Sequence, residues 1–180
     1  IFGQTLGIIG LGNIGAAIAR RGFHGFNMNI LYHGRREKLE LAQPLNARFC
    51  ELDELLEQSD FIVVAVDLNA NTQHLIDAEA FKKMQSHAVF VNISRGAVVD
   101  EQALIQALEQ KQIFAAGLDV YEKEPLQDSA LFQLHNVVTL PHIGSATSVT
   151  RKKMSELAYQ NLVKALEGGQ PQYVVNPEFR

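Results

Sequence analysis

The stretch that decides the fold is Leu6-Gly7-Ile8-Ile9-Gly10-Leu11-Gly12-Asn13-Ile14-Gly15. It places the pattern G-x-G-x-x-G between an apolar run that predicts a strand and residues 16–20, which predict the continuation of a helix. The first glycine permits a tight turn, the second lets the backbone approach a pyrophosphate, and the third lets the helix pack on its strand. N–H groups at the start of such a helix attract an anion. Residues 10–15 therefore predict a dinucleotide-binding turn rather than a chance glycine-rich loop.

Strands and helices alternate along the rest of the chain, which is the pattern of a doubly wound parallel sheet. Apolar runs predict strands at residues 5–9, 27–32, 61–65, 88–93, 114–120 and 137–140. Helices are predicted at residues 13–22, 53–58, 77–84, 100–110 and 151–166. Asp53 is the expected N-cap of the second helix. We therefore predict an α/β Rossmann-type fold of three layers, with a dinucleotide-binding domain over residues 1–170 and a tail over residues 171–180.

The composition is that of an ordinary globular domain, with 180 residues, 47% of them hydrophobic and 20% charged. The formal net charge of −4 argues against a nucleic-acid partner. No apolar run is long enough to span a bilayer, so we expect no membrane partner. Cys50 is the only cysteine, which excludes an internal disulfide and fits a reducing, cytoplasmic setting. No metal site is expected, because the spacing typical of metal ligands is missing from His24, His74, His87 and His135.

Two arginines follow the second predicted strand, in Tyr32-His33-Gly34-Arg35-Arg36. Domains of this class that prefer NAD place an acid there to bind the ribose 2′-OH, and the first carboxylate here is Glu37. Two guanidinium groups can bind a 2′-phosphate bidentately. We therefore predict NADP(H) as the preferred cofactor, with His33, Arg35 and Arg36 near the 2′ position and NAD(H) as the second candidate. The alternative is that Arg35 and Arg36 are solvated charges at the start of a surface helix.

Arg95, Glu124 and His142 each follow a predicted strand. Ligands bind beyond the carboxyl ends of parallel strands, so these side chains are expected at one rim. An arginine fork can hold a carboxylate and polarise the neighbouring carbonyl, and a histidine can protonate the carbonyl oxygen as hydride arrives. A carboxylate on the other ring nitrogen would favour the protonated imidazole. Taken singly, each residue is better explained as a structural or solvated loop residue, but together they predict the reduction of a 2-oxo acid.

Four stretches together resemble the D-isomer-specific 2-hydroxyacid dehydrogenases. They are Asn92-Ile93-Ser94-Arg95-Gly96, Ala116-Gly117-Leu118-Asp119-Val120, Glu124-Pro125-Leu126 and Pro141-His142-Ile143-Gly144-Ser145-Ala146. The resemblance implies that Arg95 binds the substrate and that Glu124 and His142 form the acid–base pair. The further cofactor contacts that it implies are Leu68, Thr72, Ile93, Ser94, Arg95, Asp119, His142 and Gly144. Within the family, the chain is most similar to the NADP-linked branch that reduces glyoxylate, hydroxypyruvate or 2-ketogluconate.

The same resemblance implies partners. Members of the family have a second domain that completes the substrate pocket, so we expect residues 171–180 to lead to a substrate domain absent from this chain. A homodimer formed through the cofactor domain is also expected. Two alternatives stay open: a dinucleotide-sensing binding protein or corepressor of the same fold without turnover, and an NAD-linked phosphoglycerate or formate dehydrogenase. The second of these would be expected to carry an acid after the second strand.

Overall fold

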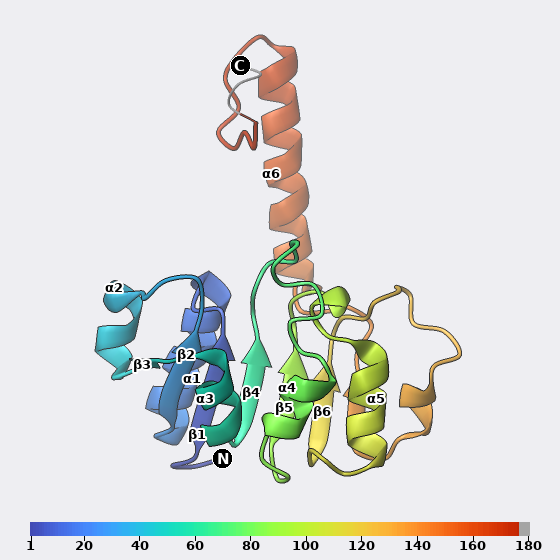
Figure 1. The fold of residues 1–180 in the computed structure, drawn as a ribbon. Coiled ribbons are helices and arrows are strands. Elements are labelled where there is room, and N and C mark those ends of the chain that lie inside the picture. The colour runs from blue at the N-terminus through green and yellow to red at the C-terminus, as the bar shows by residue number, and fades with distance from the viewer. Residues whose placement is uncertain (177–180) are drawn as a thin grey trace. The chain divides into compact units, whose positions relative to one another are not determined.

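The computed structural model of the chain describes residues 1–176 (Figure 1). It contains two compact units, Ile1–Pro141 and His142–Arg180. The end of the predicted tail, residues 177–180, lies outside the described residues. The division at residue 170 stays a prediction.

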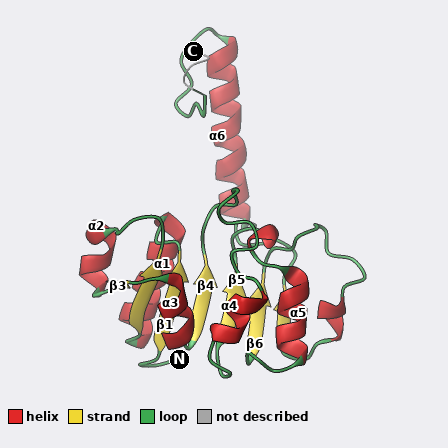
Figure 2. Cartoon of the chain, in the orientation of Figure 1, coloured by secondary structure: helices red, strands yellow, loops and turns green. Residues whose placement is uncertain are grey.

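One parallel sheet runs through the first unit (Figure 2), with its seven strands in the order β3-β2-β1-β4-β5-β6-β7. The strands are β1 (Thr5–Ile9), β2 (Asn29–His33), β3 (Arg48–Phe49), β4 (Phe61–Val64), β5 (Val89–Asn92), β6 (Ala115–Leu118) and β7 (Val137–Thr139). Ile9 pairs with His33 on one side and with Val64 on the other, so β1, β2 and β4 end at one level. The strand order reverses between β1 and β4, and this switch point is where ligands bind in open α/β sheets.

Helices connect the strands of the first unit. They are α1 (Asn13–Phe26), α2 (Leu39–Ala42), α3 (Leu52–Gln58), α4 (Ala78–Lys83) and α5 (Glu101–Glu109), with the short 3₁₀ helices η1 (Gln43–Leu45), η2 (Gly96–Val98) and η3 (Ala130–Gln133). Asp77 caps α4 and Asp100 caps α5, each by accepting a backbone N–H three residues later. The predicted cap at Asp53 is wrong. Helix α3 begins at Leu52, and Asp53 lies in its first turn, where the helix dipole still favours a carboxylate.

Both faces of the sheet are covered, which confirms the three-layer prediction. Successive strand residues point to opposite faces. On β1, Ile8 packs in a cluster with Ala16 and Ala19 of α1. The next residue, Ile9, packs in a larger cluster that takes in residues of α3, α4 and α5 such as Leu55. Figure 2 shows these three helices on one face of the sheet.

The second unit contains one long helix, α6 (Ser148–Leu166). It begins three residues before the predicted start because the Thr147 hydroxyl accepts the backbone N–H of Thr150 at 3.2 Å. It stops before Gly168, whose φ of 77° is unfavourable for other residues. No residue of this fully described helix is buried. Across residues 1–176, no helix combines the length and apolar character that a bilayer crossing requires.

Candidate active site

The glycine turn after β1 is shaped by close backbone contacts. Gly10 has a φ of 101°, and a Cβ placed on it would lie 2.6 Å from the carbonyl oxygen of Ala65. A Cβ on Gly15 would collide with the Gly10 carbonyl oxygen, so α1 can approach the turn only with glycine there. Gly12, just before α1, faces open space, because a Cβ on it would meet no atom within 4 Å. The turn therefore leaves its outer backbone accessible to a ligand.

A cleft of about 740 Å³ lies over this turn, between the loops that follow β2 and β4. The predicted cofactor residues that line it are Gly10, Leu11, Gly12, His33, Arg35, Arg36 and Thr72. Other predicted residues of the same segments are not in its lining: Asn13, Ile14, Gly15 and Leu68. Sequence reasoning missed several lining residues, among them Tyr32, Lys38, Asn69 and Asn71. Lys38 adds a third cation to the two arginines, a signal that was visible two positions after Arg36.

The imidazole of His33, at the end of β2, is held in one orientation. Its Nδ1 lies 3.0 Å from the carbonyl oxygen of Cys50, so this nitrogen carries the hydrogen and donates it. The imidazole is stacked on Phe49, with 6.4 Å between ring centroids and 7° between planes. Arg35 and Arg36 follow with exposed guanidinium groups. A fixed imidazole and two arginines therefore face the cleft where a ribose 2′ substituent is expected.

The loop after β4 closes on itself. The Thr72 hydroxyl donates to the carbonyl oxygen of Asp67 at 2.6 Å and accepts the backbone N–H of Asn69 at 2.8 Å. The Asn69 side chain accepts the N–H of Asn71 at 2.9 Å. These bonds fix the loop and place Thr72 in the cleft lining.

Arg95 is presented by a turn that a buried asparagine organises. Asn92 is 2% exposed, and its Oδ1 accepts both the N–H and the hydroxyl of Ser94 at 3.1 Å. Its Nδ2 donates to the carbonyl oxygen of Arg95 at 3.1 Å. The Arg95 side chain is exposed and donates through Nη1 to the carbonyl oxygen of Ser94 at 2.7 Å. Sequence reasoning missed the role of Asn92, although a polar residue in a buried strand is itself a signal.

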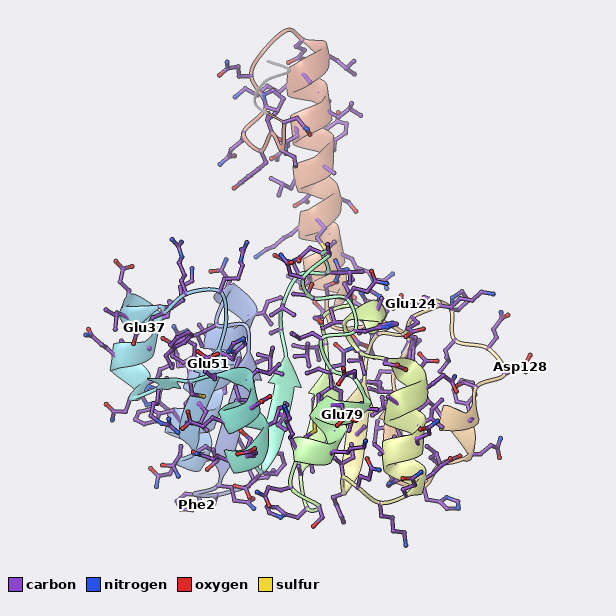
Figure 3. The ribbon with its side chains drawn as sticks, viewed as in Figure 1. Phe2, Glu37, Glu51, Glu79, Glu124 and Asp128 are labelled. Atoms are coloured by element: carbon purple, nitrogen blue, oxygen red, sulfur yellow. The ribbon has the colours of Figure 1, made fainter. Side chains whose placement is uncertain are left out.

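Glu124 lies in the next loop, beyond the carboxyl ends of the strands (Figure 3). Its carboxylate accepts the backbone N–H of Tyr121 at 3.1 Å. The Tyr121 hydroxyl lies 2.8 Å from the carbonyl oxygen of Leu140, which ties this loop to the end of β7. Burial raises the pKa of Tyr121, so its phenol stays a neutral donor. The backbone of Gly96 packs directly on Tyr121, so the loops that carry Arg95 and Glu124 are in contact.

The remaining predicted residues fall at the edges of these segments. Ile93 is half-buried after β5, and Asp119, after β6, is 7% exposed with its N–H donated to the carbonyl oxygen of Asn92 at 3.0 Å. His142 and Gly144 begin the second unit, where His142 has a left-handed φ of 54°. The Ile143 carbonyl accepts the N–H of Ala146 at 2.9 Å in the turn that leads to α6.

The fold and the cleft define a Rossmann-type α/β domain. A sequence profile described as "D-isomer specific 2-hydroxyacid dehydrogenase, NAD binding domain" matches residues 1–144. The chain belongs to this family, and its matched residues are the NAD-binding domain.

Comparisons with individual proteins support the same family. The chain is 53% identical over 176 residues to the glyoxylate/hydroxypyruvate reductase B of Cronobacter sakazakii, covering 97% of this chain and 54% of that protein. It is similar in structure to a glyoxylate reductase from Paecilomyes thermophila, with a TM-score of 0.88, 43% identity and coverage of 99% and 54%. The TT0316 protein from Thermus thermophilus gives a TM-score of 0.90, 41% identity and coverage of 97% and 54%. The chain thus spans about half the length of these relatives.

Proposed function

We propose that this chain is the cofactor-binding part of an NADP(H)-dependent reductase that converts a small 2-oxo acid to the D-2-hydroxy acid. The observation that carries the proposal is the contact between the loops bearing Arg95 and Glu124, beyond the carboxyl ends of adjacent strands. The identity to a curated glyoxylate/hydroxypyruvate reductase supports the same reaction. Glyoxylate and hydroxypyruvate are the leading substrates, and 2-ketogluconate is the third.

The lining of the cleft suits the pyrophosphate and the 2′-substituted ribose of a dinucleotide. Gly12 leaves room for a pyrophosphate beside the backbone, and the first turn of α1 contains no acidic residue and has no side-chain cap. His33, Arg35 and Arg36 would hold a 2′-phosphate, which favours NADP(H) over NAD(H). Asp119 would contact the nicotinamide end, and Ile93 and Ser94 would be further cofactor contacts. When bound, this cofactor supplies the hydride.

Three side chains, Arg95, His142 and Glu124, would bind the substrate and transfer the proton. Arg95 binds the substrate carboxylate and polarises the adjacent carbonyl with its forked donors. His142 donates a proton to the carbonyl oxygen, and Glu124 accepts a hydrogen bond from the other ring nitrogen. The pocket for the rest of the substrate would come from a second domain, and the assembly would be a homodimer.

The test uses the full-length gene product and follows NADPH oxidation with glyoxylate, hydroxypyruvate and 2-ketogluconate. We expect turnover with at least one acid, a D-configured product where the product is chiral, and faster turnover with NADPH than with NADH. The His142→Ala variant should lose at least ~10²-fold in kcat, the usual contribution of a general acid. Cofactor binding without turnover of any of the three acids would instead favour a dinucleotide-sensing binding protein.

A further inference from the structure

His74 joins the cofactor cleft to the loop that carries Glu124. It lies at the end of the loop after β4, one residue before the cleft residue Leu75. Its Nε2 lies 3.0 Å from a carboxylate oxygen of Glu122, two residues before Glu124. This contact needs no particular charge on the histidine, because a neutral imidazole also donates through Nε2–H. The pair therefore connects two of the segments that form the candidate site.

Glu101 holds the loop that carries Glu124 from a second side. The same oxygen of Glu122 accepts the backbone N–H of Glu101 at 3.1 Å, and the Glu101 carboxylate accepts the N–H of Glu122 at 3.3 Å. Glu101 begins α5, whose cap Asp100 donates its N–H to the Ile76 carbonyl at 2.9 Å, next to the isolated bridge between Ile76 and Val99. Glu122 is thus held between a rigid helix start and His74.

The backbone of His74 reaches the third segment. Its N–H donates to the carbonyl oxygen of Ala97 at 2.8 Å, two residues after Arg95. Its φ of 48° lies in the left-handed region, which histidine and asparagine tolerate better than most residues. One residue therefore contacts the loops after β5 and β6 while it ends the loop that lines the cleft.

We propose that His74 is a positioning residue that fixes the Glu124 loop, residues 119–126, relative to the cofactor cleft through Glu122. The proposal rests on the proposed function in so far as Glu124 takes part in turnover. No step of the reaction passes through His74 itself. Its loss lowers the fraction of molecules in which the Glu124 loop is correctly placed.

The test compares three variants of the full-length protein. His74→Asn keeps tolerance of the left-handed backbone but is too short to reach Glu122, and His74→Gln restores a donor of greater reach. His87→Asn is the matched control, because it removes a similar pair, 2.7 Å from Asp60, at the amino ends of the strands. An exposed pair of this kind is worth up to about a fivefold change in an equilibrium. We expect kcat to fall about twofold to fivefold in His74→Asn, to recover in His74→Gln and to stay unchanged in His87→Asn.

Two readouts separate positioning from general stability. The amides of Tyr121 and Glu122 donate to side-chain carboxylates, so hydrogen exchange in residues 119–126 should speed up in His74→Asn and not in His87→Asn. In a double-mutant cycle, adding His74→Asn to Glu122→Ala should lower kcat no further, because both act through one contact. The proposal would be overturned if His74→Asn left hydrogen exchange in residues 119–126 or kcat unchanged. It would also be overturned if the losses in kcat of His74→Asn and Glu122→Ala multiplied in the double variant. A wild-type protein without turnover, or a Glu124→Gln variant with full kcat, would instead identify a failure of the proposed function.

Discussion

The backbone of Gly96 lies against the carbonyl group of Tyr121, so closely that a Cβ on Gly96 would overlap the Tyr121 carbonyl and the Glu122 nitrogen. The constraint is one of space, because Gly96 does not occupy the left-handed region. This contact brings the turn after Arg95 against the start of the Glu124 loop. Glycine at this position is therefore a requirement of the candidate site as well as of the fold.

Gly96→Ala is expected to destabilise the protein by about 1–3 kcal/mol or more, since neighbouring backbone cannot move aside as a flexible side chain can. Gly25→Ala is the matched control. Gly25 lies near the end of α1 with nothing within 4 Å of its built Cβ, so alanine there should stabilise by up to about 1 kcal/mol. Urea unfolding of both variants gives the comparison. Equal stability of the two would show that the Gly96 contact is not a constraint.

Acid should weaken the fold through Asp60. Burial favours its neutral form, but hydrogen bonds from the Thr5 N–H and from His87, each 2.7 Å long, outweigh burial and lower the pKa of Asp60. A carboxyl with a lowered folded-state pKa adds stability above its unfolded pKa, about 3.9. That stability is lost as the pH falls through the folded pKa. We therefore expect the urea concentration at the unfolding midpoint to decrease as the pH is lowered from about 5 to about 3.

The Asp60→Asn variant should be less stable than wild type near neutral pH and should lose less stability over the same acidic interval. Asp53→Asn is the control, because Asp53 forms an exposed pair 2.6 Å from Lys83. The pH dependence of its stability should stay closer to wild type than that of Asp60→Asn, because an exposed ion pair contributes little to stability. An Asp60→Asn variant with the wild-type acid slope would assign the loss to other groups.

Continuous or patterned segments made most of the fold predictable. The strands β1, β4 and β5 are apolar runs, and each was predicted to within about one residue at its ends. Strand β3 was missed because it has two residues, Arg48 and Phe49, and exists through pairing with Leu31 and Tyr32. The one-turn helix α2 is equally too short to show a period.

Some residues of the candidate site could likewise be predicted from local sequence, and others could not. The positions of the Gly10 turn and of Arg35 at the cleft were predictable, because a local motif and its distance from the strand carry that information. Asn92 acts through bonds to its own turn, and its place at the end of a predicted buried strand was a signal that could have identified it. His74 contacts Glu122, 48 positions along the chain, and no local pattern connects them. Interactions of this kind depend on the tertiary arrangement and could not be read from the sequence.

Replacing both arginines, Arg35→Ala with Arg36→Ala, should weaken NADPH binding and leave NADH binding nearly unchanged. Charge-assisted bonds contribute about 1.5–3 kcal/mol each, so a loss of at least about tenfold in NADPH affinity is expected. The double variant Arg20→Ala with Arg21→Ala is the control, since these exposed arginines of α1 are not in the cleft lining. Titration of both cofactors measures the preference. A wild-type protein that binds NADH more tightly than NADPH would contradict the NADP(H) assignment.

Arg95→Lys should separate charge from geometry at the proposed substrate site. Lysine keeps the positive charge but loses the planar fork that binds a carboxylate with two parallel bonds, so the KM for the 2-oxo acid should rise about tenfold. The turn itself is held by the Asn92 side chain through backbone groups of Ser94 and Arg95, and these bonds do not depend on the side chain at position 95. The unfolding midpoint should therefore stay near wild type, and the KM for NADPH should change less than the KM for the 2-oxo acid. Arg48→Lys, at an exposed pair with Glu54, is the control for a change of arginine to lysine as such. A rise in both KM values together would mean that residue 95 acts on the cofactor end of the site rather than on the substrate carboxylate.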